Sequence, residues 1–122
     1  MKKLLIIFIV TIYSCGNTSY FDGVGIPARE EKSGDYGIVN LNGDIVVDFE
    51  LDEKPSIMVE NWSYFENTKG NINFVNNKSK IIETTHESSL LFNEGHVVVR
   101  LSSGQLAILD NNLNLVQTLV GV

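Results

Sequence analysis

Residues 34–46 read GDYGIVNLNGDIV, and this stretch decides the fold. Apolar residues lie on both sides of a polar centre, Asn40 to Asp44. Within that centre, Asn42-Gly43 is a strong hairpin signal, because both residue types tolerate a positive φ. The stretch therefore predicts two antiparallel strands joined by a tight turn.

The same arrangement recurs twice further along the chain, at spacings of 36 and 34 residues. A glycine precedes the first apolar run and an Asn or Asp follows it each time: Gly34, Gly70 and Gly104, with Asn40, Asn76 and Asp110. Apolar positions follow the same frame: Ile38, Phe74 and Ile108, then Ile45, Ile81 and Leu115. Periods of this length are typical of repeat architectures.

Each unit is expected to form three short strands, because Val, Ile and Phe dominate the apolar runs. No stretch after the N-terminal segment combines a sustained 3.6-residue period with helix caps, so no further helix is expected. We therefore expect an all-β fold, an antiparallel meander of three repeated three-stranded units that forms a short solenoid or a curled sheet after an N-terminal signal helix. The units cover about 23–53, 54–87 and 88–122, too few for a closed propeller.

These residues resemble the WG-containing repeat (KWG type). Its pattern is an aromatic-Gly pair, two apolar residues, Asp, a turn ending in Gly and an apolar pair, as in Tyr36–Val46. The stretch Phe92–Gly95 is similar to the Phe-x-Glu-Gly element of that family. The aromatic-Gly pair becomes Ile72-Asn73 and then Leu106-Ala107 in the later units. The resemblance covers most of residues 23–122 and implies repeated β-hairpins in exported bacterial proteins, with no known catalytic chemistry.

The first fourteen residues are typical of a secretory signal peptide. Lys2 and Lys3 precede the ten-residue run LLIIFIVTIY, residues 4–13. A helix of that length covers about 15 Å, whereas the hydrocarbon core of a bilayer is about 30 Å thick. Residues 1–14 are therefore predicted to direct export rather than to span a membrane.

Cys15 follows the apolar run directly, and the segment resembles a bacterial lipoprotein signal, in which this cysteine is lipidated and becomes the mature N-terminus. Tyr13 departs from that pattern, which has a small residue there. The alternative is an ordinary signal peptide followed by a chance cysteine. The resemblance predicts a lipid-anchored envelope protein with residues 15–22 as a lipidated tether. Gly16, in place of a retention Asp, favours the outer membrane.

Composition excludes several other classes. Nine basic residues stand against fifteen acidic ones, for a net charge of −6, which argues against a nucleic-acid partner. A single cysteine excludes an intrachain disulfide and a four-cysteine zinc site. No nucleotide-binding or nucleophile motif is present. We therefore expect no enzyme activity, no catalytic residues, no cofactor and no metal.

Three polar features favour structural roles over chemistry. Asp48, Glu50 and Asp52 would share one strand face, where they could bind a cation but where charge also protects an edge strand. Asp110, Asn112 and Asn114 begin like a calcium loop, but Leu115 and Gly121 replace its Gly and Glu, which favours a turn. His86 and His96 fall at different places in the repeat; a pocket joining them with carboxylates would favour an enzyme of unknown class.

Trp62 and Tyr64 are the strongest candidates for a partner contact. They would share one face of a strand, with Phe65 opposite. Exposed, they could stack on a sugar or anchor a protein; buried, they would fill the core. The leading hypothesis is thus a binding or structural module of the envelope, with another envelope protein or a glycan as a partner besides the membrane. The alternative is a periplasmic ligand-binding or inhibitor protein that uses this aromatic pair.

Overall fold

The structure is a computed structural model that describes residues 22–119. The predicted signal helix, Cys15 and all of the tether except Asp22 lie outside the described residues, as do residues 120–122. The described residues form ten strands and no helix, so the predicted all-β class is confirmed for this part of the chain. No helix in residues 22–119 is long and apolar enough to cross a membrane.

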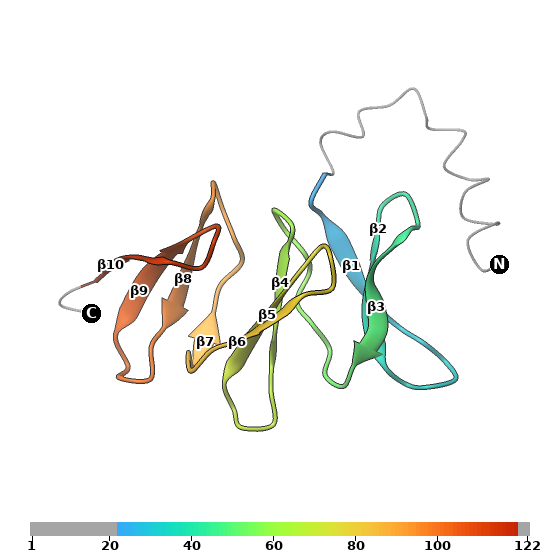
Figure 1. Cartoon of the computed structure of the whole chain (residues 1–122), viewed down its shortest axis with the longest axis horizontal. Helices are drawn as coiled ribbons and strands as arrows, with labels where there is room; N and C mark the ends of the chain where they lie inside the picture. The colour runs from blue at the N-terminus through green and yellow to red at the C-terminus, as the bar shows by residue number, and fades with distance from the viewer. Residues whose placement is uncertain (1–21, 120–122) are drawn as a thin grey trace.

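The strands form three antiparallel sheets that lie side by side along the long axis of the molecule (Figure 1). Every hydrogen-bonded strand pair joins strands that are consecutive in sequence. The first sheet contains β1 (Gly25–Arg29), β2 (Tyr36–Asn40) and β3 (Ile45–Leu51). The second contains β4 (Trp62–Glu66), β5 (Ile72–Asn76) and β6 (Ile81–Glu83). The third contains β7 (Ser88–Ser89), β8 (His96–Arg100), β9 (Leu106–Asp110) and β10 (Leu115–Thr118).

The hairpin predicted from residues 34–46 is formed by β2 and β3. The side-chain oxygen of Asn40 accepts hydrogen bonds from the backbone N–H groups of Asn42 and Asp44, both at 2.9 Å. An Asn is well suited to this role, because its short side chain can bond to the backbone just ahead of it. Gly43 completes the turn at φ 85°, a conformation that favours glycine.

The corresponding turns of the other two sheets have the same hydrogen bonds. Asn76 accepts from the N–H groups of Lys78 and Lys80, and Asp110 accepts from those of Asn112 and Asn114. The residue in the place of Gly43 is Ser79 at φ 63° and then Leu113 at φ 66°. The turn is therefore kept by the Asx side chain even where glycine is replaced, so the Asx residue marks it better than the glycine does.

The glycines at the other end of the hairpins also share a conformation. Gly34, Gly70 and Gly104 have φ values of 76°, 82° and 88°, and each lies in the turn that joins the first two long strands of its sheet. The hairpins are therefore in phase with the glycine spacing seen in the sequence.

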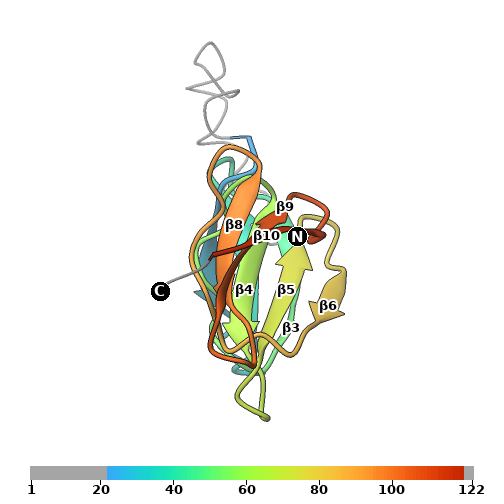
Figure 2. The same ribbon diagram turned by 90° about the vertical axis from the view of Figure 1, so that its left-hand side faces the viewer.

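Two hydrophobic clusters hold the sheets together, one at each junction. The first joins residues of the first sheet to the second sheet and the segment before it: Ile38, Val47, Leu51, Met58, Phe65 and Val75. The second joins the second sheet to the third: Ile72, Phe74, Phe92, Val97, Val99, Ala107 and Leu109. The middle sheet is thus covered on both faces, and the sheets overlap when viewed end-on (Figure 2).

Two details differ from the simplest expectation. The third sheet has a fourth strand, because Ser88 and Ser89 pair with Arg100 and Val99. In the first sheet, the register of β3 shifts twice against β2. Such bulges reorient side chains, so Leu51 is buried in the first cluster, whereas Phe49 lies over Gly37. Phe49 and Leu51 therefore pack in different surroundings, although they are only two residues apart on β3.

Candidate functional site

In each sheet, the segment just before the first long strand and the turn just after the second long strand lie at the same edge of the molecule. This edge is here named the upper edge (Figure 1). The register requires this placement. Gly25 pairs with Asn40, Trp62 with Asn76 and His96 with Asp110, so each strand start lies beside an Asx turn. The chain also enters the described structure at this edge, at Asp22.

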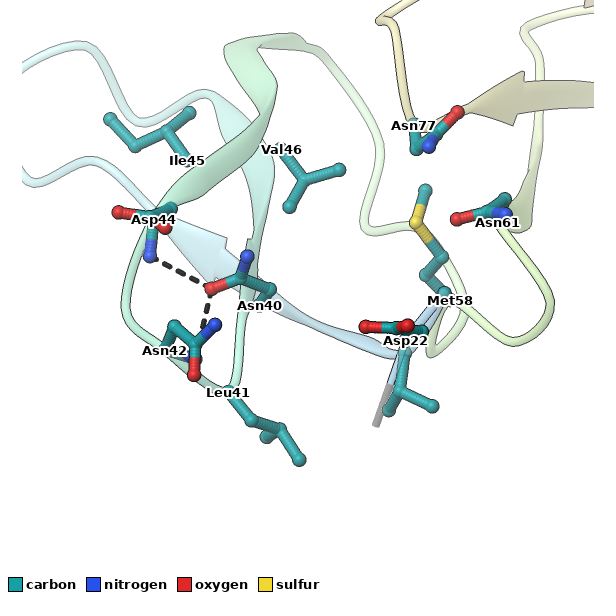
Figure 3. A pocket seen from close by; sticks show the side chains of 12 residues that line it. Asp22, Asn40, Leu41, Asn42, Asp44, Ile45, Val46, Met58, Asn61 and Asn77 are labelled. Carbon is teal, nitrogen blue, oxygen red and sulfur yellow. Dashed lines mark hydrogen bonds between the residues drawn. The ribbon is translucent and has the colours of Figure 1, made fainter. Parts of the chain in front are cut away.

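A cavity of about 550 Å³, here named the turn pocket, opens at the upper edge between the first two sheets (Figure 3). It takes its walls from three turns and from the segment before β1. It is lined by Asp22, Gly23, Val24, Asn40, Leu41, Asn42, Asp44, Ile45, Val46, Met58, Asn61 and Asn77. Asn61 and Asn77, which belong to turns of the second sheet, form one side of the pocket, across from Asn40 and Asp44 of the first sheet. The pocket thus exists only because the two sheets stack.

The lining combines hydrogen-bonding groups with an apolar floor. Asp22 and Asp44 supply carboxylates, and four asparagines supply amides. The oxygen of Asn40 is engaged by two backbone N–H groups, so its amide N–H₂ is the group left to bind elsewhere. Met58 is 1% exposed and closes the inner end. Paired donors and acceptors over apolar carbon suit a neutral ligand rich in hydroxyl or amide groups.

Sequence reasoning identified the Asx turns but not the pocket. The repeat spacing indicates that Asn40 and Asn76 are equivalent positions, but no pattern in the sequence singles out Asp44, Asn61 or Asn77. They come together through the stacking of sheets, which no local pattern encodes. The clustering of Asx residues at a recurring place was the one available signal.

Trp62 and Tyr64 lie at the junction between the second and third sheets. Both are half-buried and pack against the second hydrophobic cluster, while Phe65 belongs to the first. The indole of Trp62 is stacked on Phe92, with ring centroids 5.8 Å apart and planes at 16°, and meets Phe74 edge-on at 6.2 Å. This pair therefore contributes much of its apolar surface to packing within the protein.

The indole N–H of Trp62 also has a partner. It donates a hydrogen bond of 3.0 Å to the backbone carbonyl of Asn111, in the Asx turn of the third sheet. Together with the Phe92 contact, this bond ties the start of β4 to two segments of the third sheet. A role for Trp62 and Tyr64 in binding a partner stays a prediction.

The acidic run lies on an edge strand. Asp48 and Glu50 are exposed on β3, which has a neighbour on one side only within its sheet, and Asp52 follows it. The N–H of Asp48 donates to the hydroxyl of Ser79 at 3.1 Å, which links the edge to the second sheet. Across residues 22–119, no group of three His, Cys, Asp or Glu side chains is placed to hold a metal ion.

The two histidines lie at opposite edges. His96 begins β8 at the upper edge, whereas the carbonyl of His86 accepts from Ile72 at the lower end of β5. Burial lowers the pKa of His86, and its Nδ1 is buried without a hydrogen-bond partner. The histidines therefore form no joint site.

The pKa of Asp110 is also lowered, chiefly by the hydrogen bonds from the N–H groups of Asn114 and Asn112.

No protein-family model, no curated protein and no solved structure matches the chain.

Proposed function

We propose that the protein is an exported bacterial lipoprotein, anchored through Cys15, whose WG-like repeats form a non-catalytic binding module of the cell envelope. The shared hydrogen bonds of the three Asx turns, together with the recurring glycines, support the repeat assignment. The apolar run followed at once by Cys15 supports the anchor. Gly16 favours the outer membrane as its location.

The observation that carries the proposal is the turn pocket at the edge where the chain enters from residue 22. Seven residue steps separate Cys15 from Asp22, and an extended chain covers at most about 3.5 Å per residue. The pocket would thus lie within about 25 Å of the lipid attached to Cys15. A ligand of this pocket would be held close to the membrane surface.

The charge of the protein agrees with anchoring by lipid rather than by a protein surface. Removal of residues 1–14 takes away Lys2 and Lys3, which changes the net charge from −6 to −8. An acidic protein is repelled by anionic head groups, so its attachment would depend on the acyl chains. Several acyl chains together give a stable anchor, unlike a single myristoyl chain.

The ligand class that fits the turn pocket best is a glycan. Asn and Asp side chains bond readily to neighbouring hydroxyl groups, and the pocket-lining side chains of Ile45 and Val46 can take the C–H face of a sugar ring. Trp62 is already stacked on Phe92 and bonded to Asn111, so we assign the primary contact to the pocket rather than to the aromatic pair.

The anchor is tested by metabolic labelling with radioactive palmitate in cells that express the full chain. The natural sequence should be labelled and should fractionate with membranes. Cys15→Ala should lose the label and leave the membrane fraction. Unchanged labelling and fractionation of Cys15→Ala would contradict the anchor.

The pocket is tested by binding of the purified protein to an array of bacterial cell-wall and surface glycans. The double variant Asp44→Ala with Asn77→Ala should lose binding at least tenfold. Asn111→Ala is the matched control, because Asn111 occupies the place of Asn77 in the third Asx turn and lies outside the pocket lining. Binding that survives the pocket variant and fails in the control would move the site to the third sheet. If the pocket captures an envelope protein and binds no glycan, the ligand is a protein and the proposed glycan ligand is wrong.

A further inference from the structure

The outward face of the third sheet, here named the end face, is apolar and uncovered by residues 22–119. It forms a groove of about 580 Å³ lined by Leu90, Leu91, Asn93, Glu94, His96, Val98, Ile108 and Val116. Leu90 is 61% exposed and Val116 is 53% exposed. An exposed apolar patch of this kind usually marks an interaction site. The terminal units of a stacked array normally have a polar outer face, which the end face lacks.

The same positions in the second sheet are covered. The cross-strand pair Tyr64–Phe74 lies on the face of the second sheet that the third sheet packs against. Val98 and Ile108 form the equivalent pair of the third sheet, two residues after the start of β8. The first sheet packs against the second, and the second packs against the third. The end face is the surface of the third sheet that a further sheet would cover if this stacking continued.

A polar contact follows the same series. Glu60 is the first residue of a two-residue turn, at φ 53°, and its carboxylate accepts the backbone N–H groups of Glu94 and Gly95 in the next sheet at 2.6 and 2.7 Å. Glu94 holds the same place in the equivalent turn, at φ 51°, and its side chain is exposed. The carboxylate of Glu94 is thus placed to accept hydrogen bonds from the backbone N–H groups of a turn in a further sheet.

The opposite end of the molecule offers both of the matching features. Across the first sheet, Ile26 pairs with Val39 and Val39 with Ile45, which gives an apolar row in which Ile26 is 48% exposed and Ile45 is 36% exposed. At its upper edge, Gly23 and Val24 immediately precede β1, as Glu94 and Gly95 immediately precede β8, so their backbone N–H groups hold the places of those that Glu60 binds. The first sheet can therefore present to another molecule what the third sheet presents to the second.

We propose that the end face binds the first sheet of a second copy of this chain, head to tail. In this arrangement Glu94 of one copy accepts the N–H groups of the turn at Gly23 of the next. His96 takes the place of Trp62 and lies beside the turn at Leu41, as Trp62 lies beside Asn111. Such a contact is heterologous and can extend into a row. Every copy would then keep its upper edge on the same side.

The test is disulfide cross-linking of the full chain in a Cys15→Ser background, so that engineered thiols are the only ones present. His96→Cys and Leu41→Cys are prepared separately and then mixed under mild oxidation. Both positions are exposed, so the substitutions leave the core intact. A disulfide-linked dimer should form in the mixture and not with either variant alone. Because Cys15 is replaced and no glycan is added, the result does not depend on the lipid anchor or on ligand binding in the turn pocket, although Leu41 is part of the pocket lining.

A second measurement uses sedimentation of the same Cys15→Ser chain over a range of concentrations. Its mean mass should rise with concentration, and Val116→Glu should weaken association at least tenfold. Lys80→Glu, away from both end surfaces, should leave association unchanged. Cross-linking of His96→Cys with itself would indicate a face-to-face dimer and overturn the proposal. A monomer at all concentrations, with no cross-link in the mixture, would also overturn it.

Discussion

The carboxylate of Glu60 accepts a 2.7 Å hydrogen bond from the backbone N–H of Gly95, 35 residues later in the chain. The neighbouring N–H of Glu94 binds the same carboxylate at 2.6 Å. Hydrogen bonds to an ionised acceptor are about twice as strong as neutral ones. This one side chain therefore fixes how the turn of the third sheet sits on the turn of the second.

Replacing Glu60 by glutamine should weaken that link. Glu60→Gln keeps the length of the side chain but has one neutral oxygen in place of two charged ones. We expect a loss of about 1 kcal/mol in the free energy of unfolding, measured by urea denaturation. Glu53→Gln, at an exposed position after β3, is the control and should change little. Equal losses in both variants would indicate a general charge effect.

Trp62 is the single tryptophan of the chain, so its fluorescence reports directly on the junction of the second and third sheets. Trp62→Phe should keep the stacking on Phe92 but lose the bond to Asn111, at a cost of about 1 kcal/mol. Trp62→Ala should cost about 3 kcal/mol, because a large half-buried ring is lost as well. Differential scanning calorimetry measures both. A smaller effect for alanine than for phenylalanine would contradict the packing described here.

Asp110 should make stability depend on acid pH. Its pKa lies below the ordinary 3.8 in the folded chain, because two backbone N–H groups bond to the charged form. The stabilisation is therefore present above about pH 4 and is lost as pH falls from 3.8 through the folded pKa. Asp110→Asn keeps the acceptor, as Asn40 and Asn76 do, and should remove this part of the acid sensitivity. Urea midpoints between pH 5 and 2.5 test this, and parallel curves for the two proteins would contradict it.

His86 should contribute a second pH dependence, nearer neutrality. Burial lowers its pKa below 6.5, so the unfolded chain takes up a proton more readily than the folded chain. The stability contributed by neutral His86 is full above pH 6.5 and falls as pH decreases through the folded pKa. His86→Leu removes this titration and the unpartnered Nδ1, so it should be the more stable protein at pH 5.5. Thermal melts at pH 7.5 and 5.5 measure the difference, with His96→Gln as the control.

The local part of the fold could be predicted from sequence, because its signals are local. Asn42-Gly43 marked the first hairpin, and the spacing of Asn40, Asn76 and Asp110 placed three turns. The pairing of Ser88 and Ser89 with β8 could not be predicted, since two polar residues carry no strand pattern. The turn pocket was missed for a related reason. Asp44 and Asn77 come to line opposite sides of one cavity through the stacking of sheets, and neither residue type signals this by itself.

If the chain is exported through a membrane channel from its N-terminus, as proposed above, the pairing of strands only with their sequence neighbours affects how it can fold. Once residues up to Val75 have emerged, all members of the first hydrophobic cluster are present, and the first sheet can pack against the hairpin of β4 and β5. Later strands then pair with strands that have already folded, and no earlier pairing has to be broken. The chain can therefore fold while it is being exported, and little apolar surface stays exposed until the last segment has emerged.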